Sequence, residues 1–210
     1  VIYNHFDKKG KDIRSFLSLM GREKRYLDCN HEETTLTMAI KATDKVLEKT
    51  GLLATELDLI IYTTQTPETV LPSNAVRLFD HIKGKHETII YDLNANCAGM
   101  TVALEQACQY MMGNKRIQKA LIVGSDLFSS VAHEDDPLVY GCFSDGAVAM
   151  IIERTEEENT GYVDSVYHVN TVDFAEKMML PAEGFTKAAR ETGDFKHVLT
   201  IPFDGSSVLE

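Results

Sequence analysis

Short apolar runs alternate with stretches of helical periodicity, and this alternation constrains the fold more than any other feature of the sequence. The expected strands, each a short and nearly continuous apolar run, are residues 57–63, 88–93, 120–123 and 148–152. The expected helices, whose apolar residues recur every three or four positions, are residues 35–50, 73–83 and 100–112. Strand, helix and strand in this order predict a parallel sheet covered by helices, and therefore an α/β fold.

Two of these helices carry signals at their ends. Thr34 or Thr35 is the expected cap of the first helix, and Gly51 is expected to end it. Ser73 is the expected cap of the second helix, and Gly84 is expected to end that one.

Composition narrows the function classes. The 210-residue chain carries 21 Lys and Arg against 32 Asp and Glu, a net charge of −11, which argues against sequence-independent binding to nucleic acid. No stretch approaches the roughly 20 apolar residues that cross a bilayer, and nothing at the start is typical of a secretory signal. We therefore expect a cytoplasmic protein with no membrane partner and no nucleic-acid partner.

The four cysteines stand at positions 29, 97, 108 and 142, and none forms a C-x-x-C pair. This spacing disfavours a disulfide framework and a zinc site, so we expect reduced thiols and no bound metal. Cys108 lies on the apolar side of a predicted helix and is expected to belong to the core.

Cys97 has the most informative setting. It follows a predicted buried strand and precedes a predicted helix, with the small residues Ala98 and Gly99 beside it. Unpaired N–H groups and the positive end of the helix dipole favour a thiolate there. A turn between strand and helix also exposes a side chain where α/β folds bind ligands. From this pattern alone, a nucleophile and a buried structural cysteine both remain open.

Residues 92–100 resemble the active-site elbow of the β-ketoacyl-acyl carrier protein synthase III family, condensing enzymes of the thiolase superfamily. Further segments resemble this family in the same order along the chain: residues 33–39, 58–67, 71–73, 120–126 and 143–147. The resemblance implies a thiolase-like layered α/β/α/β/α architecture built from two duplicated halves, of which this chain holds mainly the first.

The resemblance also implies an activity. Cys97 would accept an acyl group from acyl-CoA or an acyl-carrier thioester, and malonyl-acyl carrier protein would then lose CO2 and condense with it in a Claisen reaction of fatty acid or related biosynthesis. The thioester is the substrate, and no resident cofactor is expected. The implied partners are acyl carrier protein and a second copy of the chain in a homodimer.

The same resemblance divides the chain. Residues 1–154 are expected to form the half that carries the nucleophile, and residues 155–210 the truncated start of the second half. Residues 162–169 alternate like an exposed strand, and residues 201–210 resemble the strand and turn that precede the next family helix. The family's His-Gln-x-Asn and Gly-Asn-Thr segments are not found. We therefore expect a clipped start, a coding sequence that continues past residue 210, and a fragment that is inactive alone.

Several positions depart from the family in ways that bear on substrate binding. Phe16 and Pro137 stand where family members hold adenine between a Trp and an Arg, so Phe16 is a candidate contact to the substrate. Leu71 stands where a Phe often reaches the partner's acyl pocket. A smaller residue there would admit a longer or branched acyl group, or Leu71 simply anchors its loop. Asn94 and Asn96 either bond around the elbow, with Asn96 contacting substrate, or satisfy the turn.

Two other functions remain open. Hydroxymethylglutaryl-CoA synthase shares the fold and the cysteine but uses a Glu base where this chain has Gln65. An amide cannot act as a general base, so this alternative ranks lower. The chain could also be a non-catalytic dimerisation or carrier-docking module, for which the apolar strand at residues 120–123 would suit a paired sheet.

Overall fold

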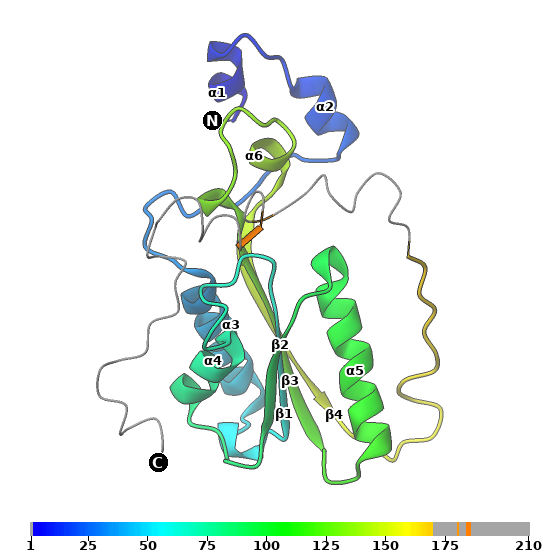
Figure 1. Ribbon diagram of the computed structural model, residues 1–210. Coiled ribbons are helices and arrows are strands. Elements are labelled where there is room, and N and C mark those ends of the chain that lie inside the picture. Colours follow the sequence, from blue (N-terminus) through cyan, green and yellow to red (C-terminus); the bar gives the residue numbers. More distant parts are fainter. Residues whose placement is uncertain (1, 170–179, 181–183, 186–210) are drawn as a thin grey trace, which may run out of the picture. The chain divides into compact units, whose positions relative to one another are not determined.

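The computed structural model describes residues 2–169, 180, 184 and 185. The chain divides into two units, Val1–Asp164 and Ser165–Glu210. The helices and strands discussed below all belong to the first unit (Figure 1).

The first unit is built on a four-stranded sheet in the order β2-β1-β3-β4. Its strands are β1 (Leu59–Thr63), β2 (Ile89–Leu93), β3 (Lys119–Leu127) and β4 (Asp145–Glu153). β1 runs parallel to β2 and to β3, which confirms the predicted parallel layer. β4 runs antiparallel to β3, because the connection between them consists of turns and two short helices, without a long helix that crosses the sheet.

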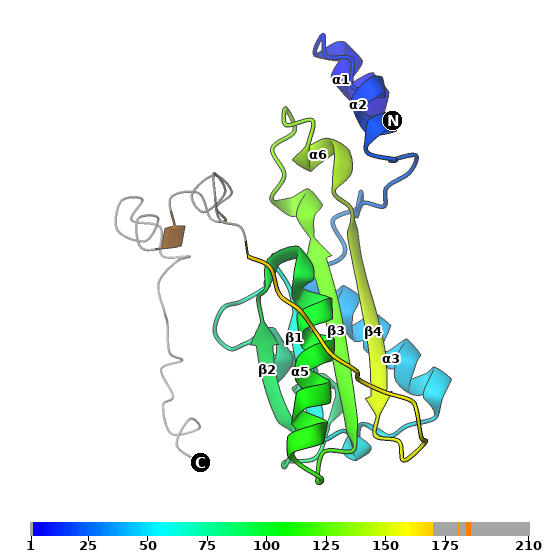
Figure 2. The same ribbon diagram turned by 90° about the vertical axis from the view of Figure 1, so that its right-hand side faces the viewer.

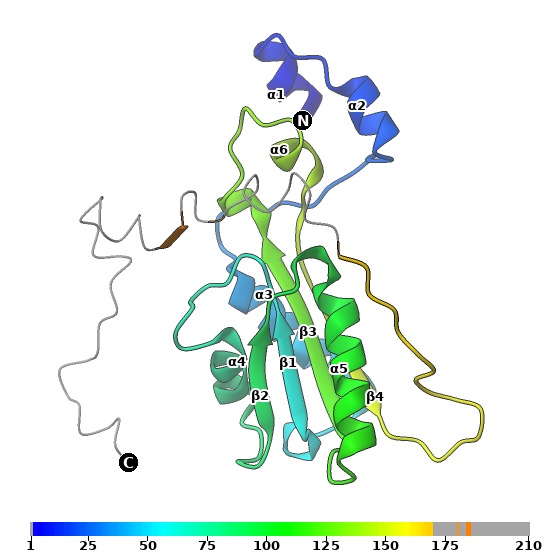
Figure 3. The same ribbon diagram turned by 45° about the vertical axis from the view of Figure 1, so that its right-hand side comes forward.

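Helices cover both faces of this sheet. α3 (Thr35–Thr50) and α4 (Asn74–Ile82) lie on one face, and α5 (Gly99–Gly113) lies on the other, as Figures 1, 2 and 3 show from three directions. All three helices were predicted from the apolar spacing. Single-turn 3-10 helices join some of these elements: η1 (Ala54–Glu56), η2 (Asn96–Ala98) and η3 (Phe128–Ser130).

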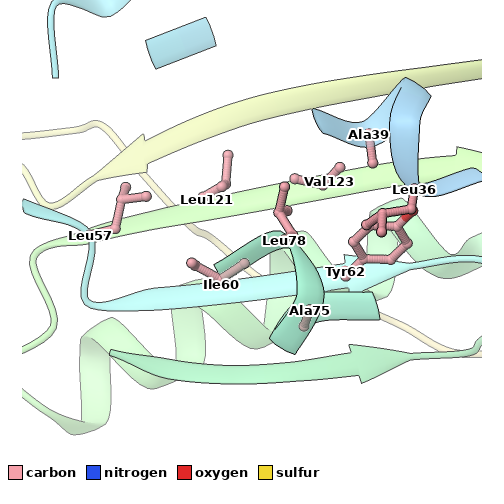
Figure 4. Close-up of a cluster of buried hydrophobic side chains, with 9 residues drawn as sticks. All are labelled: Leu36, Ala39, Leu57, Ile60, Tyr62, Ala75, Leu78, Leu121 and Val123. Carbon is pink, nitrogen blue, oxygen red and sulfur yellow. The ribbon is translucent and has the colours of Figure 1, made fainter. Parts of the chain in front are cut away.

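Strand β1 forms the centre of the core and is buried on both faces, as predicted. Ile60 and Tyr62 are fully buried in the cluster beneath α3 and α4 (Figure 4), and Leu59 and Ile61 are fully buried in the cluster beneath α5. β2 was also predicted to be buried on both faces, but all of its residues are only half-buried. It lies at an edge of the described sheet, where it pairs with a neighbouring strand on one side only.

The structure also decides the helix ends. The Thr34 side chain accepts a backbone N–H from the first turn of α3, whereas the Thr35 hydroxyl donates to a loop carbonyl, so Thr34 is the cap. Ser73 caps α4 as predicted. The prediction that Gly84 ends α4 was wrong by one residue, because Lys83 already adopts the left-handed conformation, with φ 55°.

Two short helices at the start of the chain were not predicted: α1 (Ile2–Lys8) and α2 (Arg14–Leu19). They pack against α6 (Val139–Cys142), and their buried cluster includes Phe6 and Cys142. Because part of this cluster comes from residues more than a hundred positions away, the sequence of the two helices alone carries little signal.

The predicted exposed strand at residues 162–169 is absent: the structure describes these residues and places no strand there. Val163 is 93% exposed and Val166 is 91% exposed. The strand and turn expected at residues 201–210 lie outside the described residues.

Candidate active site

The ends of all four strands meet at one edge of the sheet. Thr63, at the carboxyl end of β1, is in register with Leu93 of β2 and with Gly124 of β3. β4 starts at the same edge, because its Gly146 pairs with Asp126 of β3. α/β folds bind ligands at the carboxyl ends of their parallel strands, so a ligand site is expected at this edge.

A cavity of about 530 Å³ opens at this edge. Gln65, Cys97 and Asp126 line it from the segments that end the three parallel strands, and Asp145 lines it from the start of β4. A volume of this size lies within the range of small-molecule sites. The predicted nucleophile therefore stands in the wall of a ligand-sized cavity.

Cys97 lies in η2, the single turn between β2 and α5, as the sequence predicted, and it is exposed. The next helix begins at the buried Gly99. A Cβ built on Gly99 would stand 2.0 Å from Thr63 Oγ1, so only glycine lets α5 begin this close to β1. This close approach fixes the turn that carries Cys97 against the end of the sheet.

Asp92 ties the strand that leads to Cys97 to a neighbouring helix. One carboxylate oxygen accepts from Asn74 N at 2.7 Å and from Asn74 Nδ2 at 3.0 Å. The other oxygen accepts from Ala75 N at 2.6 Å. Asp92 therefore satisfies free N–H groups at the start of α4 and holds the end of β2 at the same time.

The segment after β1 approaches the nucleophile. Gln65 Nε2 lies 3.9 Å from Cys97 Sγ, within the range of a hydrogen bond to sulfur. Asp126 Oδ1 holds this segment by accepting from Gln65 N at 2.7 Å, Thr66 N at 3.1 Å, Thr64 Oγ1 at 3.0 Å and Thr66 Oγ1 at 3.2 Å. One carboxylate therefore fixes the backbone from which the Gln65 side chain reaches Cys97.

The predicted substrate contacts do not all lie together. Asn96 lines the cavity beside Cys97. Its backbone N–H donates to Asn94 Oδ1 at 3.0 Å, so the Asn94 amide serves the turn. Leu71 is 68% exposed on its loop and does not line the cavity. Phe16 lies on α2, where it packs against the cluster that contains Cys142, and does not line the cavity either.

The other three cysteines differ from Cys97. Cys142 also lines the cavity but is buried, and burial raises the pKa of its thiol despite nearby arginines. Cys108, expected in the core, is only half-buried on α5, and burial together with a neighbouring glutamate raises its pKa. Cys29 is exposed and does not line the cavity. Cys97 alone combines exposure with a place in the cavity wall.

Comparison with known proteins gives this arrangement a family. The family model for 3-oxoacyl-(acyl-carrier-protein) synthase III matches residues 91–171, which include Cys97. The β-ketoacyl-(acyl-carrier-protein) synthase III of Chlorobaculum tepidum is 30% identical over 190 residues, covering 90% of this chain and 56% of that protein. The Streptococcus agalactiae enzyme of the same name is 33% identical over 142 residues, covering 68% of this chain and 43% of that protein. The chain belongs to the β-ketoacyl-acyl carrier protein synthase III family.

A solved synthase III structure supports the same family and confirms the predicted thiolase-like fold. The crystal structure of 3-oxoacyl-(acyl-carrier-protein) synthase III from Aquifex aeolicus VF5 superposes with a TM-score of 0.63 at 29% identity, covering 68% of this chain and 46% of that one. The chain spans about half the length of the curated synthase III relatives that it matches.

Sequence reasoning missed two residues of this candidate site. Asp126 was noticed only as part of a family-like segment, and Gln65 only as the residue in the place of a Glu base. Both stand at the ends of predicted parallel strands, and strands of this kind bring their carboxyl ends to one edge. Comparing the residues that end each predicted strand would have placed both of them beside Cys97.

Proposed function

We propose that this chain carries the acyl-accepting site of a β-ketoacyl-acyl carrier protein synthase III, with Cys97 as the nucleophile. The observation that carries the proposal is an exposed cysteine in the turn just before α5, in the wall of a ligand-sized cavity and within the residues that match the family model. α5 begins two residues after Cys97, so the unpaired N–H groups and the positive end of the helix dipole lie next to the turn that carries it.

The proposed chemistry has two steps. The Cys97 thiolate attacks the carbonyl carbon of an acyl thioester; the new S–C bond forms, the old C–S bond breaks, and the departing thiolate takes up a proton. Malonyl-acyl carrier protein then loses CO2, and the electron pair of the broken C–C bond attacks the bound acyl carbon, which releases Cys97 as a thiolate. The thioesters supply all reacting groups, so we propose that no resident cofactor takes part.

The described residues supply groups for the acyl transfer to Cys97 and fewer groups for the condensation that follows. No histidine is among the residues that the structure shows lining the cavity. Family resemblance places the His and Asn that hold a thioester carbonyl in the second half of the fold, and such groups stabilise charge that develops on the carbonyl oxygen. We therefore propose that residues 2–164 provide the machinery for acyl transfer, and that the expected inactivity of the chain alone concerns the condensation that follows.

Three predicted contacts remain proposals. Asn96 is proposed to contact the thioester, which its place in the cavity wall supports. Leu71 is proposed to face the acyl chain across a homodimer interface, and its exposure leaves it available for such a contact. Phe16 is proposed to contact the CoA end of a donor, although its packing on α2 gives this role no support.

The proposed partners and location also rest on the family. The named relatives are β-ketoacyl-(acyl-carrier-protein) synthases III. We propose acyl carrier protein as a partner of this chain, together with a homodimer in the cytoplasm and no partnership with nucleic acid or membrane. Among the described residues, no helix has the length and apolar character needed to cross a bilayer.

Mass spectrometry of the intact chain tests the proposal. The chain is incubated with acyl-CoA and, separately, with acyl-acyl carrier protein, and is then weighed beside Cys97→Ser and the matched control Cys29→Ser, which alters the other exposed cysteine. We expect one acyl adduct on the unaltered chain and on Cys29→Ser, and none on Cys97→Ser. An undiminished adduct on folded Cys97→Ser, or no adduct on the folded unaltered chain, overturns the proposal. The second result would favour a non-catalytic docking module.

A further inference from the structure

The Gln65 side chain is the hydrogen-bond donor that the structure places at the Cys97 sulfur, with Nε2 3.9 Å from Sγ. We propose that Gln65 donates an N–H hydrogen bond to the Cys97 thiolate and thereby stabilises the attacking form of the sulfur. The inference deepens the proposed function, on which it rests for the role of Cys97 as the nucleophile.

The surroundings of Gln65 keep this donor in place. The buried Thr64 and Thr66 flank it, and the Asp126 carboxylate accepts from the backbone N–H of Gln65 itself and of Thr66, as well as from both threonine hydroxyls. A donor whose backbone is already fixed loses less entropy on meeting the thiolate than one on a free loop. Hydrogen bonds to a charged group are also stronger than those between neutral groups.

The amide is suited to this role because it is neutral. A carboxylate at position 65 would repel the thiolate, and an apolar side chain would donate nothing. The other ionisable groups lining the cavity are Arg22, Asp126, Cys142 and Asp145. Asp126 accepts from the loop after β1, and Asp145 accepts two backbone N–H groups at 2.8 Å each, so both carboxylates already have donors of their own.

Loss of this donor would change the pH profile of Cys97 alkylation in two ways. Without it, the midpoint of the pH profile for alkylation of Cys97 moves up by about 0.5 to 1 pH unit. The thiolate that then forms at high pH is less stabilised and is therefore intrinsically more reactive, so the plateau of the profile rises about two- to three-fold. A merely structural disturbance of the loop would not raise the midpoint and the plateau together.

Site-resolved alkylation tests this. The chain is treated with iodoacetamide over pH 5 to 10, and the rate at Cys97 is read by peptide mass spectrometry, with the exposed Cys29 in the same sample as an internal reference. Gln65→Met removes the donor at similar length, Gln65→Glu adds a charge at the same shape, and Gln109→Glu is the matched control, the same exchange at an exposed position of α5.

We expect Gln65→Met to show the raised midpoint and plateau, Gln65→Glu to raise the midpoint by about 1 unit or more, and Gln109→Glu to change neither. Far-ultraviolet circular dichroism confirms folding, and Gln65→Leu, which also removes the donor without adding a charge, takes the place of Gln65→Met if that variant does not fold. A profile of the folded, uncharged variant that coincides with that of the unaltered chain overturns the inference. Alkylation uses no thioester, so its result does not depend on the acylation experiment. A failure of this inference can therefore be distinguished from a failure of the proposed function.

Discussion

Replacing Gly99 by alanine tests how tightly α5 is seated on the sheet beside Cys97. The added Cβ would lie 2.0 Å from Thr63 Oγ1 and 3.2 Å from Thr63 Cβ. The oxygen must therefore move by roughly 1.5 Å to reach an ordinary contact of about 3.5 Å. Overpacking of this kind costs about 1–3 kcal/mol, and we expect Gly99→Ala to lower the free energy of unfolding by about that amount.

A double-mutant cycle identifies the cause. Thr63→Ala removes Oγ1 and Cγ2 and leaves the Thr63 Cβ contact at 3.2 Å. The double variant should therefore be more stable than the sum of the two single losses by about 1 kcal/mol or more. Gly113→Ala is the matched control at the other end of α5, where an added Cβ meets nothing within 4 Å, and it should be neutral or slightly stabilising.

Urea unfolding followed by circular dichroism measures the free energy of unfolding of the four variants and of the unaltered chain, and the rate of Cys97 alkylation reports whether the turn has moved. We expect Gly99→Ala to change that rate and Gly113→Ala to leave it unchanged. Full stability of Gly99→Ala, or losses that simply add in the double variant, would refute the claim that α5 begins in steric contact with β1.

Two further predictions concern stability alone. Burial by itself would raise the pKa of Asp58, but the Lys85 ammonium and two backbone N–H groups at residues 118–119 outweigh it and lower the pKa from 3.8. The ionised carboxylate therefore stabilises the fold above about pH 4, and Asp58→Asn should cost about 1–3 kcal/mol at pH 7 and less at pH 3 in urea titrations; an equal loss at both values would contradict this. Thr34→Ala should lower the free energy of unfolding by about 1 kcal/mol and Thr34→Ser by little, because only the alanine lacks the capping oxygen; equal losses in thermal unfolding would contradict the cap.

Much of the fold could be predicted because burial dictates it locally. β1 is buried on both faces, and its sequence is a continuous apolar run. α3 is buried on one side only, and its apolar residues recur with helical periodicity. The direction of β4 could not be predicted, since it depends on how residues 128–144 connect it to β3. The strand expected at residues 162–169 is not found, because alternation of apolar and polar residues over a short segment does not by itself determine a strand.

The candidate site, too, could be predicted from the sequence only in part. Cys97 could be found because strand, small residues and helix lie next to one another in the sequence. Gln65 and Asp126 could not be given roles, because their contacts span 32 and 61 residues and arise from the register of three parallel strands. Leu71 and Phe16 were proposed from resemblance alone, and the described residues do not bring either of them to the cavity.

The central claim is that Cys97, and no other thiol in the chain, accepts the acyl group. Cys142 lines the same cavity, so the decisive measurement is the position of the group itself. The chain is acylated with a thioester donor, digested at low pH, and its peptides are sequenced by tandem mass spectrometry. We predict the acyl group on the Cys97 peptide and unmodified thiols at Cys29, Cys108 and Cys142. An acyl group on Cys142, or one spread over several cysteines, would contradict the account.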